Sequence, residues 1–443
     1  MNENNNTIKL AAFEAGLIEA MRSVVDNENA INRINFFPVS DKDTGTNLST
    51  TLEMLIADYT VSESYAECLD KVSEIVFDNA RGNSGILFSI WLSGMNQHTC
   101  LKNEVAPTEF VKFFEAANKA LLHHLGNFMP GTMVSFLQAF VDDLDSALRQ
   151  NEQLEEKLEW VRHQLKQHLQ QTMEDNPVLR PHGVVDSGAL GVYFFVSTLI
   201  SHLTDEVDTE ALSTERLLSN DALLAKHEEH QTHHHAQAPD PRYCTEAKLI
   251  IDNDKLDEAK AIITAYGDCD LFLKRGNKLR FHVHCNQPKK LFGELMQIAQ
   301  VKSPKVEDML RQYQATTFKR KIALVTDTSA DIPESLVEKY HVHFIPLSIF
   351  VGHHEALDGI GIDSDALYKT LKQSDITAST ATPKMGYVKR MLDFLKSTHD
   401  HVFAITLSSN MSGTFDAVKK AAGDDSRVTL FDSKSTAGAQ GWL

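Results

Sequence analysis

NFFPVSDKDTGTN, residues 35–47, decides how the first half of this chain is interpreted. The stretch places two carboxylates, Asp41 and Asp43, two residues apart in a segment rich in Pro, Gly and Thr. Carboxylate oxygens are ligands that Mg²⁺ prefers, and Mg²⁺ bridges the phosphate oxygens in phosphoryl transfer. Ordinary turn chemistry is the competing interpretation, because Asp is common in turns. The spacing does not fit a calcium-binding EF-hand loop, which needs an oxygen ligand where Gly45 stands and Gly where Thr46 stands.

The same stretch suits an anion. Successive backbone N–H groups in a turn form an anion nest, and the positive end of a following helix adds to it. We expect a helix to begin near Asn47, and the residues that would contact the anion are Thr44, Gly45, Thr46 and Asn47. Together with the two carboxylates, the pattern predicts a site for a metal-bound phosphate.

Three further turns stand directly before apolar stretches of helical character. A turn with Gly or Ser that opens a helix is a common place for phosphate, although a helix start capped by Ser84 is the competing interpretation. The residues concerned are Asn83, Ser84 and Gly85 in ARGNSGILF, Gly131, Thr132 and Met133 in PGTMV, and Asp186 in GVVDSGALG. There is no Walker A sequence and no strand followed by G-x-G-x-x-G, so a bound nucleotide would use neither the P-loop nor the Rossmann design.

Around these turns, residues 1–205 indicate a mainly helical domain. Leu and Val recur at helical spacing over residues 153–171, which gives the clearest helix. Further helices are expected at Ile8–Asn32, Asn47–Ala57, Ser62–Asn79, Pro107–His124 and Ala189–His202. Residues 206–241 are polar and His-rich and end in prolines, so we expect a linker there in preference to a metal site at His233–His235.

Residues 242–316 change to a small α+β pattern. Strands and helices alternate, at 244–252, 254–266, 278–285 and 287–300. His282 and His284 stand two apart on the second strand, so both face one side of the sheet. With Cys244 on the first strand they form a candidate Zn²⁺ site, and a solvent-facing His pair near a buried cysteine is the alternative.

Residues 320–443 show short apolar runs that alternate with helices. The expected strands are 321–327, 342–351, 401–407 and 428–432, and the expected helices are 333–340, 384–398 and 410–422. Strands joined through helices imply right-handed crossovers and a parallel sheet. The chain is therefore expected to be multidomain, with an all-α domain, a small α+β domain and an α/β parallel-sheet domain.

Composition limits the partners. The 443 residues include 43 Lys and Arg against 61 Asp and Glu, a formal charge of −18. This balance argues against nucleic-acid binding, which needs cationic side chains. The five cysteines are sparse and the N-terminus has no basic segment followed by an apolar one, so we expect a cytoplasmic protein without a signal peptide. The most apolar run, residues 191–203, is too short to span a membrane.

In order and type, the four turns resemble the nucleotide-binding domain shared by dihydroxyacetone kinases and bacterial fatty acid kinases, the DhaL type. The matching pieces are NFFPVSDKDTGTN, ARGNSG, GTM and GVVD. The resemblance implies an antiparallel helical barrel with ATP at one end. It implies catalytic Mg²⁺ held by Asp41 and Asp43 with help from Asn35. It also implies nucleotide contacts from Ser84, Gly85, Thr132, Met133 and Asp186.

Two positions depart from parts of that family pattern. Lys42 stands where the family has Gly between the two aspartates, so its side chain would either crowd the metals or bring an ammonium to a phosphate. Thr44 stands where the dihydroxyacetone enzymes usually have His. The Thr-Gly-Thr-Asn form favours the fatty acid kinase side of the family.

The middle segment resembles the middle domain of bacterial fatty acid kinases. Tyr-Cys-Thr-Glu and His-x-His segments occur there and are associated with a bound zinc. The resemblance implies that Cys244, His282 and His284 hold Zn²⁺, and we expect its role to be structural.

Residues 321–443 resemble the first half of the DegV family, which binds fatty acids. The matching pieces are VTDTSADIP, STATP, ITLSSNMSGTFDA and LFDSKSTAGAQG. The resemblance implies that a lipid carboxylate is hydrogen-bonded by Ser379 or Thr380 and by Ser408 or Ser409, whereas helix capping is the alternative role of these hydroxyls. The match stops before the family's second half, so we expect a partial domain that lacks the other wall of the lipid pocket.

Three hypotheses follow. The leading one is an ATP- and Mg²⁺-dependent kinase that phosphorylates the carboxylate of a fatty acid, presented by the DegV-like domain of this chain or by a separate DegV-like protein. The second is a kinase whose acceptor is a small polyol or ketose, which would need a general base. The third is a lipid-binding or regulatory protein without turnover. A homodimer is an open alternative to a monomer.

Overall fold

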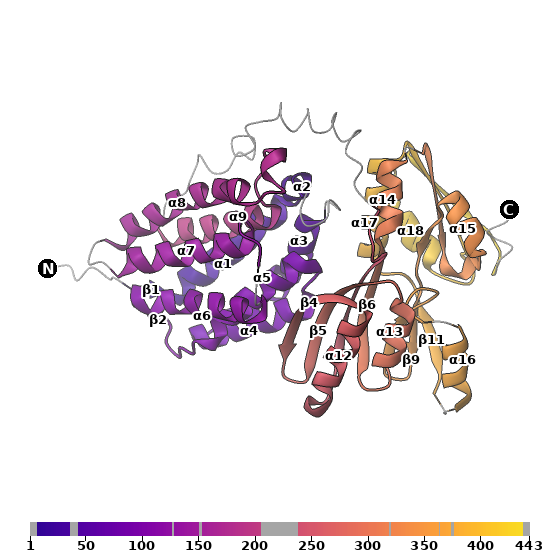
Figure 1. Ribbon diagram of the computed structural model, residues 1–443, viewed down its shortest axis with the longest axis horizontal. Coiled ribbons are helices and arrows are strands. Elements are labelled where there is room, and N and C mark those ends of the chain that lie inside the picture. Colours follow the sequence, from indigo (N-terminus) through magenta and orange to yellow (C-terminus); the bar gives the residue numbers. More distant parts are fainter. Residues whose placement is uncertain are drawn as a thin grey trace. The chain divides into compact units, whose positions relative to one another are not determined.

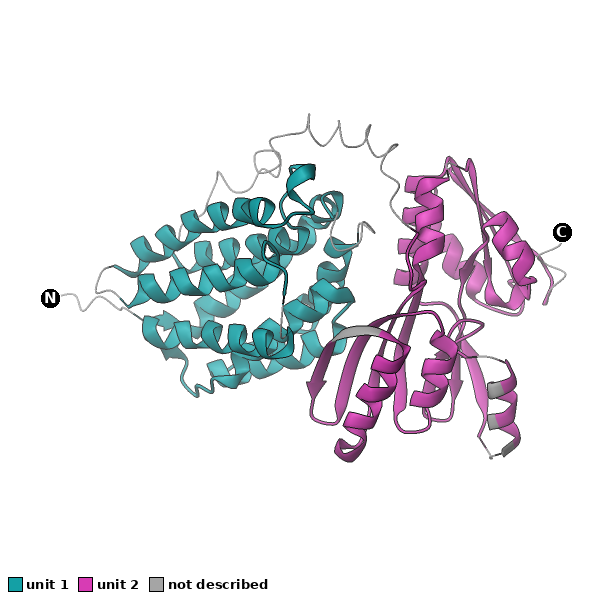
Figure 2. Ribbon diagram, in the orientation of Figure 1, with its two compact units in different colours: residues 1–236 teal, residues 237–443 magenta. Residues whose placement is uncertain are grey.

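The computed structural model describes residues 7–35, 43–125, 128–149, 153–204, 238–318, 320–362, 364–373 and 376–436. The chain forms two compact units, residues 1–236 and 237–443 (Figure 2). Asp41, Lys42 and the His233–His235 run lie outside the described residues. Within the described ranges, no helix combines the length and apolarity needed to cross a membrane.

Unit 1 is built from helices that pack side by side (Figure 1). They are α1 (Leu10–Asp26), α2 (Glu28–Arg33), α3 (Thr44–Asp58), α4 (Tyr65–Asn79), α5 (Gly82–Gly94), α6 (Pro107–Leu125), α7 (Met133–Leu148), α8 (Leu154–Asp175) and α9 (Ser187–Leu203). The helical character predicted from the sequence is confirmed. The prediction of a single helix over 8–32 is wrong, because the helix is interrupted at Asn27, between α1 and α2.

The N-terminal ends of α1, α4 and α6 meet at one end of unit 1. The short strands β1 (Ile8–Lys9) and β2 (Glu104–Val105), which precede α1 and α6, pair antiparallel. The Tyr65 backbone N–H, in the first turn of α4, donates to the Lys102 carbonyl oxygen at 3.0 Å. Helices that alternate with these three therefore begin at the opposite end, which is where the turns singled out above are found.

Aromatic side chains fill the interior of unit 1. Trp91 on α5 lies 5.7 Å from Phe114 and 6.4 Å from Phe195, measured between ring centroids, and all three are buried. The contact with Phe195 is edge-to-face, an arrangement that stabilises beyond the area it buries. The core thus fixes α5, α6 and α9 against one another and sets the positions of the turns at their ends.

The first half of unit 2 is a four-stranded antiparallel sheet in the order β4-β5-β3-β6. Its elements are β3 (Tyr243–Ile250), α12 (Leu256–Tyr266), β4 (Gly267–Arg275), β5 (Lys278–Cys285), α13 (Pro288–Leu295), β6 (Gln300–Asp308) and α14 (Met309–Thr317). Phe281, Val283 and Cys285 of β5 belong to the apolar core, as period 2 predicts. The opposite face of the sheet consequently receives His282 and His284.

The second half of unit 2 holds a parallel sheet in the order β13-β12-β7-β8 and a small antiparallel sheet in the order β10-β9-β11. The elements are β7 (Ile322–Asp327), α15 (Glu334–Tyr340), β8 (His343–Ile345), β9 (Ser348–Val351), β10 (His354–Leu357), α16 (Ser364–Gln373), β11 (Ala378–Ala381), α17 (Met385–Thr398), β12 (His401–Thr406), α18 (Thr414–Ala422) and β13 (Val428–Asp432). The predicted parallel sheet is confirmed.

One strand prediction in this half is wrong. The apolar run 342–351 forms two strands in different sheets, with β8 in the parallel sheet and β9 in the antiparallel one. Pro346 lies between them and has no backbone N–H for a ladder hydrogen bond, so the run cannot continue as one strand.

Candidate nucleotide and metal sites

The first of the four turns lies inside the beginning of α3. The helix begins at Thr44 instead of near Asn47, so the expected start was wrong by three residues. Gly and Thr are poor helix formers in a helix interior, but the first turn needs no preceding hydrogen-bond partners. Asp43 is the N-cap residue, and its carbonyl oxygen accepts from the Asn47 N–H at 2.8 Å. The amides of the first turn therefore point toward the end of unit 1 at which Asp43 stands.

Helix α2 holds this first turn in place. The Thr46 hydroxyl donates to Oε1 of Glu28 at 2.8 Å and accepts from Nδ2 of Asn32 at 2.9 Å. The Thr46 N–H donates to Oδ1 of Asn32 at 3.2 Å. A Cβ on Gly45 would stand 2.3 Å from the Glu28 carbonyl oxygen, so only glycine fits there. Thr46 thus contacts α2 directly, a role the sequence pattern did not predict.

The second turn is the beginning of α5 and lies against α3. The helix begins at Gly82 with Arg81 as N-cap, so Asn83, Ser84 and Gly85 belong to the first turn, and the capping role considered for Ser84 is wrong. Gly82 has a φ of +57°, and a Cβ there would stand 2.2 Å from Nδ2 of Asn47. The ends of α3 and α5 are therefore packed so closely that a side chain at position 82 has no room.

Thr51 links the same two helices. Its hydroxyl donates to the Asn47 carbonyl oxygen at 2.7 Å and accepts from the Arg81 N–H at 3.2 Å. A Cβ on Gly85 would stand 2.5 Å from the Thr51 Oγ1 atom. Gly85 is thus required by the approach of α5 to α3.

The third and fourth turns meet at Asp186. This residue is the N-cap of α9, and its Oδ1 accepts from the Ala189 N–H at 2.8 Å. The carboxylate also accepts from the backbone N–H groups of Met133 and Gly188. Burial raises the pKa of Asp186 to about 6, although these three donors oppose the shift. Asp186 therefore joins the first turns of α7 and α9 through one buried carboxyl group.

The Gly131–Met133 segment is a tight connection ahead of α7. Thr132 caps the helix, and its N–H donates to the Ser135 hydroxyl at 2.9 Å in a reciprocal capping box. Gly131 has a φ of +71°, and a Cβ there would stand 2.6 Å from the Thr172 carbonyl oxygen of α8. Glycine is therefore needed for both the conformation and the close approach.

A hydrogen bond connects α9 to the segment that follows α2. The Ser187 hydroxyl, in the first turn of α9, donates to Oδ1 of Asn35 at 3.2 Å. Deeper in the bundle, a Cβ on Gly191 would stand 2.4 Å from Cδ1 of Leu48 on α3. The N-terminal ends of α3, α5, α7 and α9 consequently gather at one end of unit 1, with Asn35 and Asp43 beside them.

This arrangement suits a polyphosphate and its metal. Each helix N-terminus carries a partial positive charge and backbone N–H groups without intrahelical acceptors. Asn35 and Asp43 supply the oxygen atoms that Mg²⁺ prefers. These groups are of the chemical type that binds a metal-bound polyphosphate, and the expected metal ligand Asp41 lies outside the described residues.

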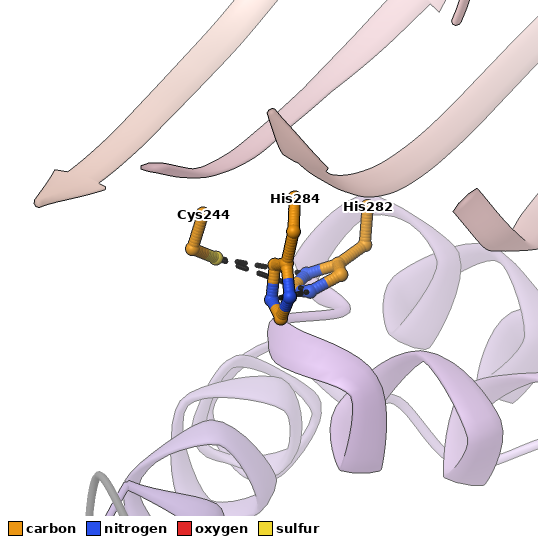
Figure 3. A group of neighbouring side chains, drawn as sticks. All are labelled: Cys244, His282 and His284. Atoms are coloured by element: carbon orange, nitrogen blue, oxygen red, sulfur yellow. Dashed lines mark hydrogen bonds between the residues drawn. The ribbon is translucent and has the colours of Figure 1, made fainter. Parts of the chain in front are cut away.

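Cys244, His282 and His284 form a compact group on the middle-domain sheet. Figure 3 shows their side chains pointing toward one another, from β3 and from β5. The ligand atoms of all three lie within 4.8 Å of one another. Antiparallel pairing places Cys244 opposite His284, which brings the cysteine to both histidines.

The distances in this group suit a tetrahedral metal. Nε2 of His282 lies 3.2 Å from Nε2 of His284, and Sγ of Cys244 lies 3.9 Å from Nε2 of His282. A tetrahedral Zn²⁺ would separate two nitrogens by about 3.4 Å and a nitrogen from a sulfur by about 3.6 Å. The three residues therefore fit Zn²⁺ with small adjustments and leave a fourth position for another ligand.

The hydroxyls expected to bind a lipid lie in two segments. Ser379 and Thr380 belong to β11, whose residues are exposed. Ser408 and Ser409 follow β12; the Ser409 hydroxyl donates to Oδ2 of Asp432 at 2.6 Å. The loop after Ser409 approaches the turn after β11, since a Cβ on Gly413 would stand 2.9 Å from the Thr382 methyl group.

Sequence reasoning missed several residues around these sites. Glu28 and Asn32 position α3 from a separate helix, and no local pattern indicates that contact. Glu246, whose Oε1 lies 3.1 Å from Nδ1 of His282, was also missed. Its position two residues after Cys244 on the same strand was a usable signal, because period 2 places both side chains on one face.

Three families match successive parts of the chain. Residues 38–201 match the DAK2 domain, residues 240–316 match the FakA-like middle domain of fatty acid kinases, and residues 321–443 match the DegV family of uncharacterised proteins. The combination expected from the sequence is confirmed. The first two matches point to a kinase-type enzyme.

Curated relatives share this chain's sequence at a moderate level. An uncharacterized protein of Staphylococcus haemolyticus is 25% identical over 321 residues, which cover 70% of this chain and 57% of the relative. An uncharacterized protein of Mycoplasma pneumoniae is 24% identical over 329 residues, covering 69% of this chain and 57% of the relative. The chain spans about half the length of the curated relatives it matches.

Solved structures resemble a part of the chain. The crystal structure of DegV, a fatty acid binding protein from Bacillus subtilis, is 31% identical, covers 28% of this chain and 44% of its own, and gives a TM-score of 0.26. A hypothetical protein of Thermotoga maritima, described as revealing a fatty acid binding function, is 28% identical, covers 28% of this chain and 46% of its own, and gives a TM-score of 0.25.

Proposed function

Because this chain joins a DAK2 domain, a FakA-like middle domain and a DegV-family segment, we propose that it is an ATP- and Mg²⁺-dependent fatty acid kinase. The acceptor is the carboxylate of a fatty acid, and the product is an acyl phosphate. The DegV-like segment of this chain, or a separate intact DegV-like protein, presents the lipid. Ser379 or Thr380 and Ser408 or Ser409 are the hydroxyls assigned to its carboxylate.

The observation that carries this proposal is the meeting of four helix N-termini at the predicted turns. The glycines at positions 45 and 131 allow close approaches to neighbouring backbone, and those at positions 82 and 85 allow close approaches to the Asn47 and Thr51 side chains. Phosphate oxygens would be bound by backbone N–H groups, chiefly from the first turns of α3 and α5, apart from the Thr46 N–H, which donates to Asn32. Asn35 and Asp43, with Asp41 outside the described residues, are assigned to Mg²⁺, which would neutralise charge on the phosphates.

The proposed reaction needs little covalent chemistry from the protein. A carboxylate oxygen of the lipid forms a bond to the γ-phosphorus, and the bond from that phosphorus to the bridging oxygen breaks as ADP leaves. The carboxylate is ionised at neutral pH, so no general base is required. The chain's contribution is to hold the two reactants in line and to place helix N-termini near the phosphates.

The middle domain is assigned a Zn²⁺ held by Cys244, His282 and His284. The support is the distance set described above and the mixed nitrogen and sulfur donors, which suit Zn²⁺. A zinc ion there would cross-link β3 and β5. We assign it a structural role.

The test is transfer of labelled γ-phosphate from ATP with Mg²⁺ to oleate or palmitate, followed by hydroxylamine trapping. Each reaction is run with and without an intact DegV-like protein. Asp43→Ala is expected to abolish the product, and Asp58→Ala, an exposed carboxylate at the far end of α3, is the matched control. Absence of a trapped product despite MgATP binding would refute the fatty acid acceptor. Phosphate transfer to dihydroxyacetone would then favour the ketose kinase, and no transfer at all a regulatory role.

A further inference from the structure

Glu246 is a buried carboxylate beside the Cys244, His282 and His284 group. It lies on β3, two residues after Cys244, and pairs with His282 of β5 in the antiparallel register. Its Oε1 lies 3.1 Å from Nδ1 of His282. The Nε2 atom of the same ring points to His284, at 3.2 Å. The two nitrogens of His282 therefore have different nearest partners, the Glu246 carboxylate at Nδ1 and the His284 ring at Nε2, while the Cys244 sulfur lies 3.9 Å from both.

We propose that Glu246 is the positioning residue of the metal site and fixes the His282 ring in the tautomer that binds metal through Nε2. This inference rests on the zinc assignment made above. A neutral imidazole carries its proton on one nitrogen and offers the other as a ligand. The carboxylate accepts only, so it holds the proton on Nδ1 and leaves the Nε2 lone pair for the metal.

Geometry separates this role from direct ligation. The lone pairs of Nδ1 and Nε2 diverge around the ring, so an oxygen that accepts from Nδ1 does not also lie at the ion bound by Nε2. The Cys244 sulfur lies 3.9 Å from each nitrogen of the His282 ring, whereas Glu246 does not belong to the group whose ligand atoms all lie within 4.8 Å of one another. Glu246 consequently orients a ligand and is not counted among the three.

Lys305 of the neighbouring strand β6 supports the same arrangement. Its Nζ lies 3.8 Å from Oε1 of Glu246 and 3.0 Å from Oε1 of Glu307. The register pairs Glu246 with Lys305 and Cys244 with Glu307. Glu307 thus contacts the same lysine as Glu246, but it lies two residues farther along β6, opposite Cys244. It is a matched control for the loss of one carboxylate from this part of the sheet.

Cobalt titration of the metal-free full chain tests the proposal. The variants are Glu246→Ala, Glu246→Gln and the control Glu307→Gln. The readout is the thiolate-to-cobalt charge-transfer band, because it requires a cysteine ligand and so excludes binding by the His-rich segment at 227–235; Cys244→Ser, which should lose the band, assigns it to Cys244. Zinc competition then gives the Zn²⁺ affinity. Far-UV circular dichroism and a thermal melt in chelator show that each variant is folded.

Loss of an outer hydrogen-bond partner of a ligating histidine weakens metal binding by roughly 10- to 100-fold, which is the expectation for Glu246→Ala. Glu246→Gln is expected to recover most of the affinity, because its amide oxygen still accepts from Nδ1. Glu307→Gln is expected to leave affinity unchanged. Long-range proton–nitrogen NMR of the metal-free protein should show His282 protonated on Nδ1 in the wild type and as a tautomer mixture in Glu246→Ala.

Three results would overturn the proposal. The first is a Glu246→Ala protein that binds cobalt as tightly as the wild type. The second is an unchanged His282 tautomer in that variant. The third is an altered ligand-field spectrum at saturation, which would make Glu246 a direct ligand. A wild-type chain that binds no metal would overturn the zinc assignment as well, whereas the phosphotransfer assay judges the kinase proposal separately.

Discussion

Replacement of Gly82 by Ala tests whether the packing of α5 against α3 forms the nucleotide site. Gly82 has a φ of +57°, and a Cβ there would stand 2.2 Å from the Asn47 side chain. The left-handed conformation costs a residue with a Cβ roughly 1–2 kcal/mol. Overpacking adds about 1–3 kcal/mol, because the buried Asn47 side chain must move. The expected loss of unfolding free energy is about 2–5 kcal/mol, by adding the two costs.

Two control variants separate these contributions. Gly276→Ala carries nearly the same φ, +56°, with nothing within 4 Å of the added Cβ, so it isolates the conformational cost of roughly 1–2 kcal/mol. Gly94→Ala crowds Ala117 at 2.8 Å, at the far end of α5 from the turn. Gly94→Ala should therefore reduce stability without changing affinity for MgATP.

Urea unfolding and calorimetric titration with MgATP are the measurements. In a Trp442→Phe background, tryptophan fluorescence follows unit 1, which contains the other two tryptophans, Trp91 and Trp160, and far-UV circular dichroism follows the whole chain. Gly82→Ala should lower both the stability of unit 1 and the affinity for MgATP. Equal stability losses in Gly82→Ala and Gly276→Ala would refute the packing argument. An unchanged affinity in a destabilised Gly82→Ala protein would refute the location of the site.

Three further outcomes are expected. Burial lowers the pKa of His343 to about 3, so only the unfolded chain takes up its proton as pH falls from 6.5 to 5. The wild type should lose about 1.5 kcal/mol relative to His343→Gln over that range in urea titrations. Thr46→Val should cost roughly 1–3 kcal/mol and weaken MgATP binding, because it leaves Glu28 without the hydroxyl donor; equal affinity would contradict the contact's role. Burial raises the pKa of Asp186 to about 6, so the folded chain binds this proton more tightly than the unfolded chain does. The free energy of unfolding should therefore fall as pH rises from about 4 to 6, and this decline should be absent in Asp186→Asn.

Element type could be predicted well wherever one face of a helix or strand is buried. Strand β5 spans Lys278–Cys285, the same residues that alternation indicated. Strand β6 was missed, because it contains Pro304 and has Ser303 at a φ of +47°, features that argue against a strand. Its place at the edge of the sheet tolerates both, since one side of an edge strand needs no ladder partner. That tolerance depends on sheet order, which local sequence does not encode.

In the candidate sites, too, some features could be predicted from the sequence and others could not. Gly45, Gly82 and Gly131 were recognised as members of turns, and the structure adds the neighbour that makes each glycine necessary. Those neighbours are Glu28, Asn47 and Thr172, of which Thr172 lies 41 positions from its glycine (172 minus 131). A residue's chemical type can be assigned from its segment. Its partner can be assigned only once the helices are packed.

Helix direction explains why turns spread between residues 35 and 188 come together. The turns open α3, α5, α7 and α9, which are every second helix from α3 onward. Connections between consecutive helices are short, so neighbouring helices run in opposite directions and every second N-terminus lies at the same end. The opposite end, where α1, α4 and α6 begin, is joined by β1, β2 and the Tyr65 hydrogen bond. An insertion that reversed the direction of one helix, such as α4, would separate the N-terminal end of α3 from that of α5, although the sequence of each turn would be intact. The site therefore requires that successive turns be separated by a whole helical hairpin.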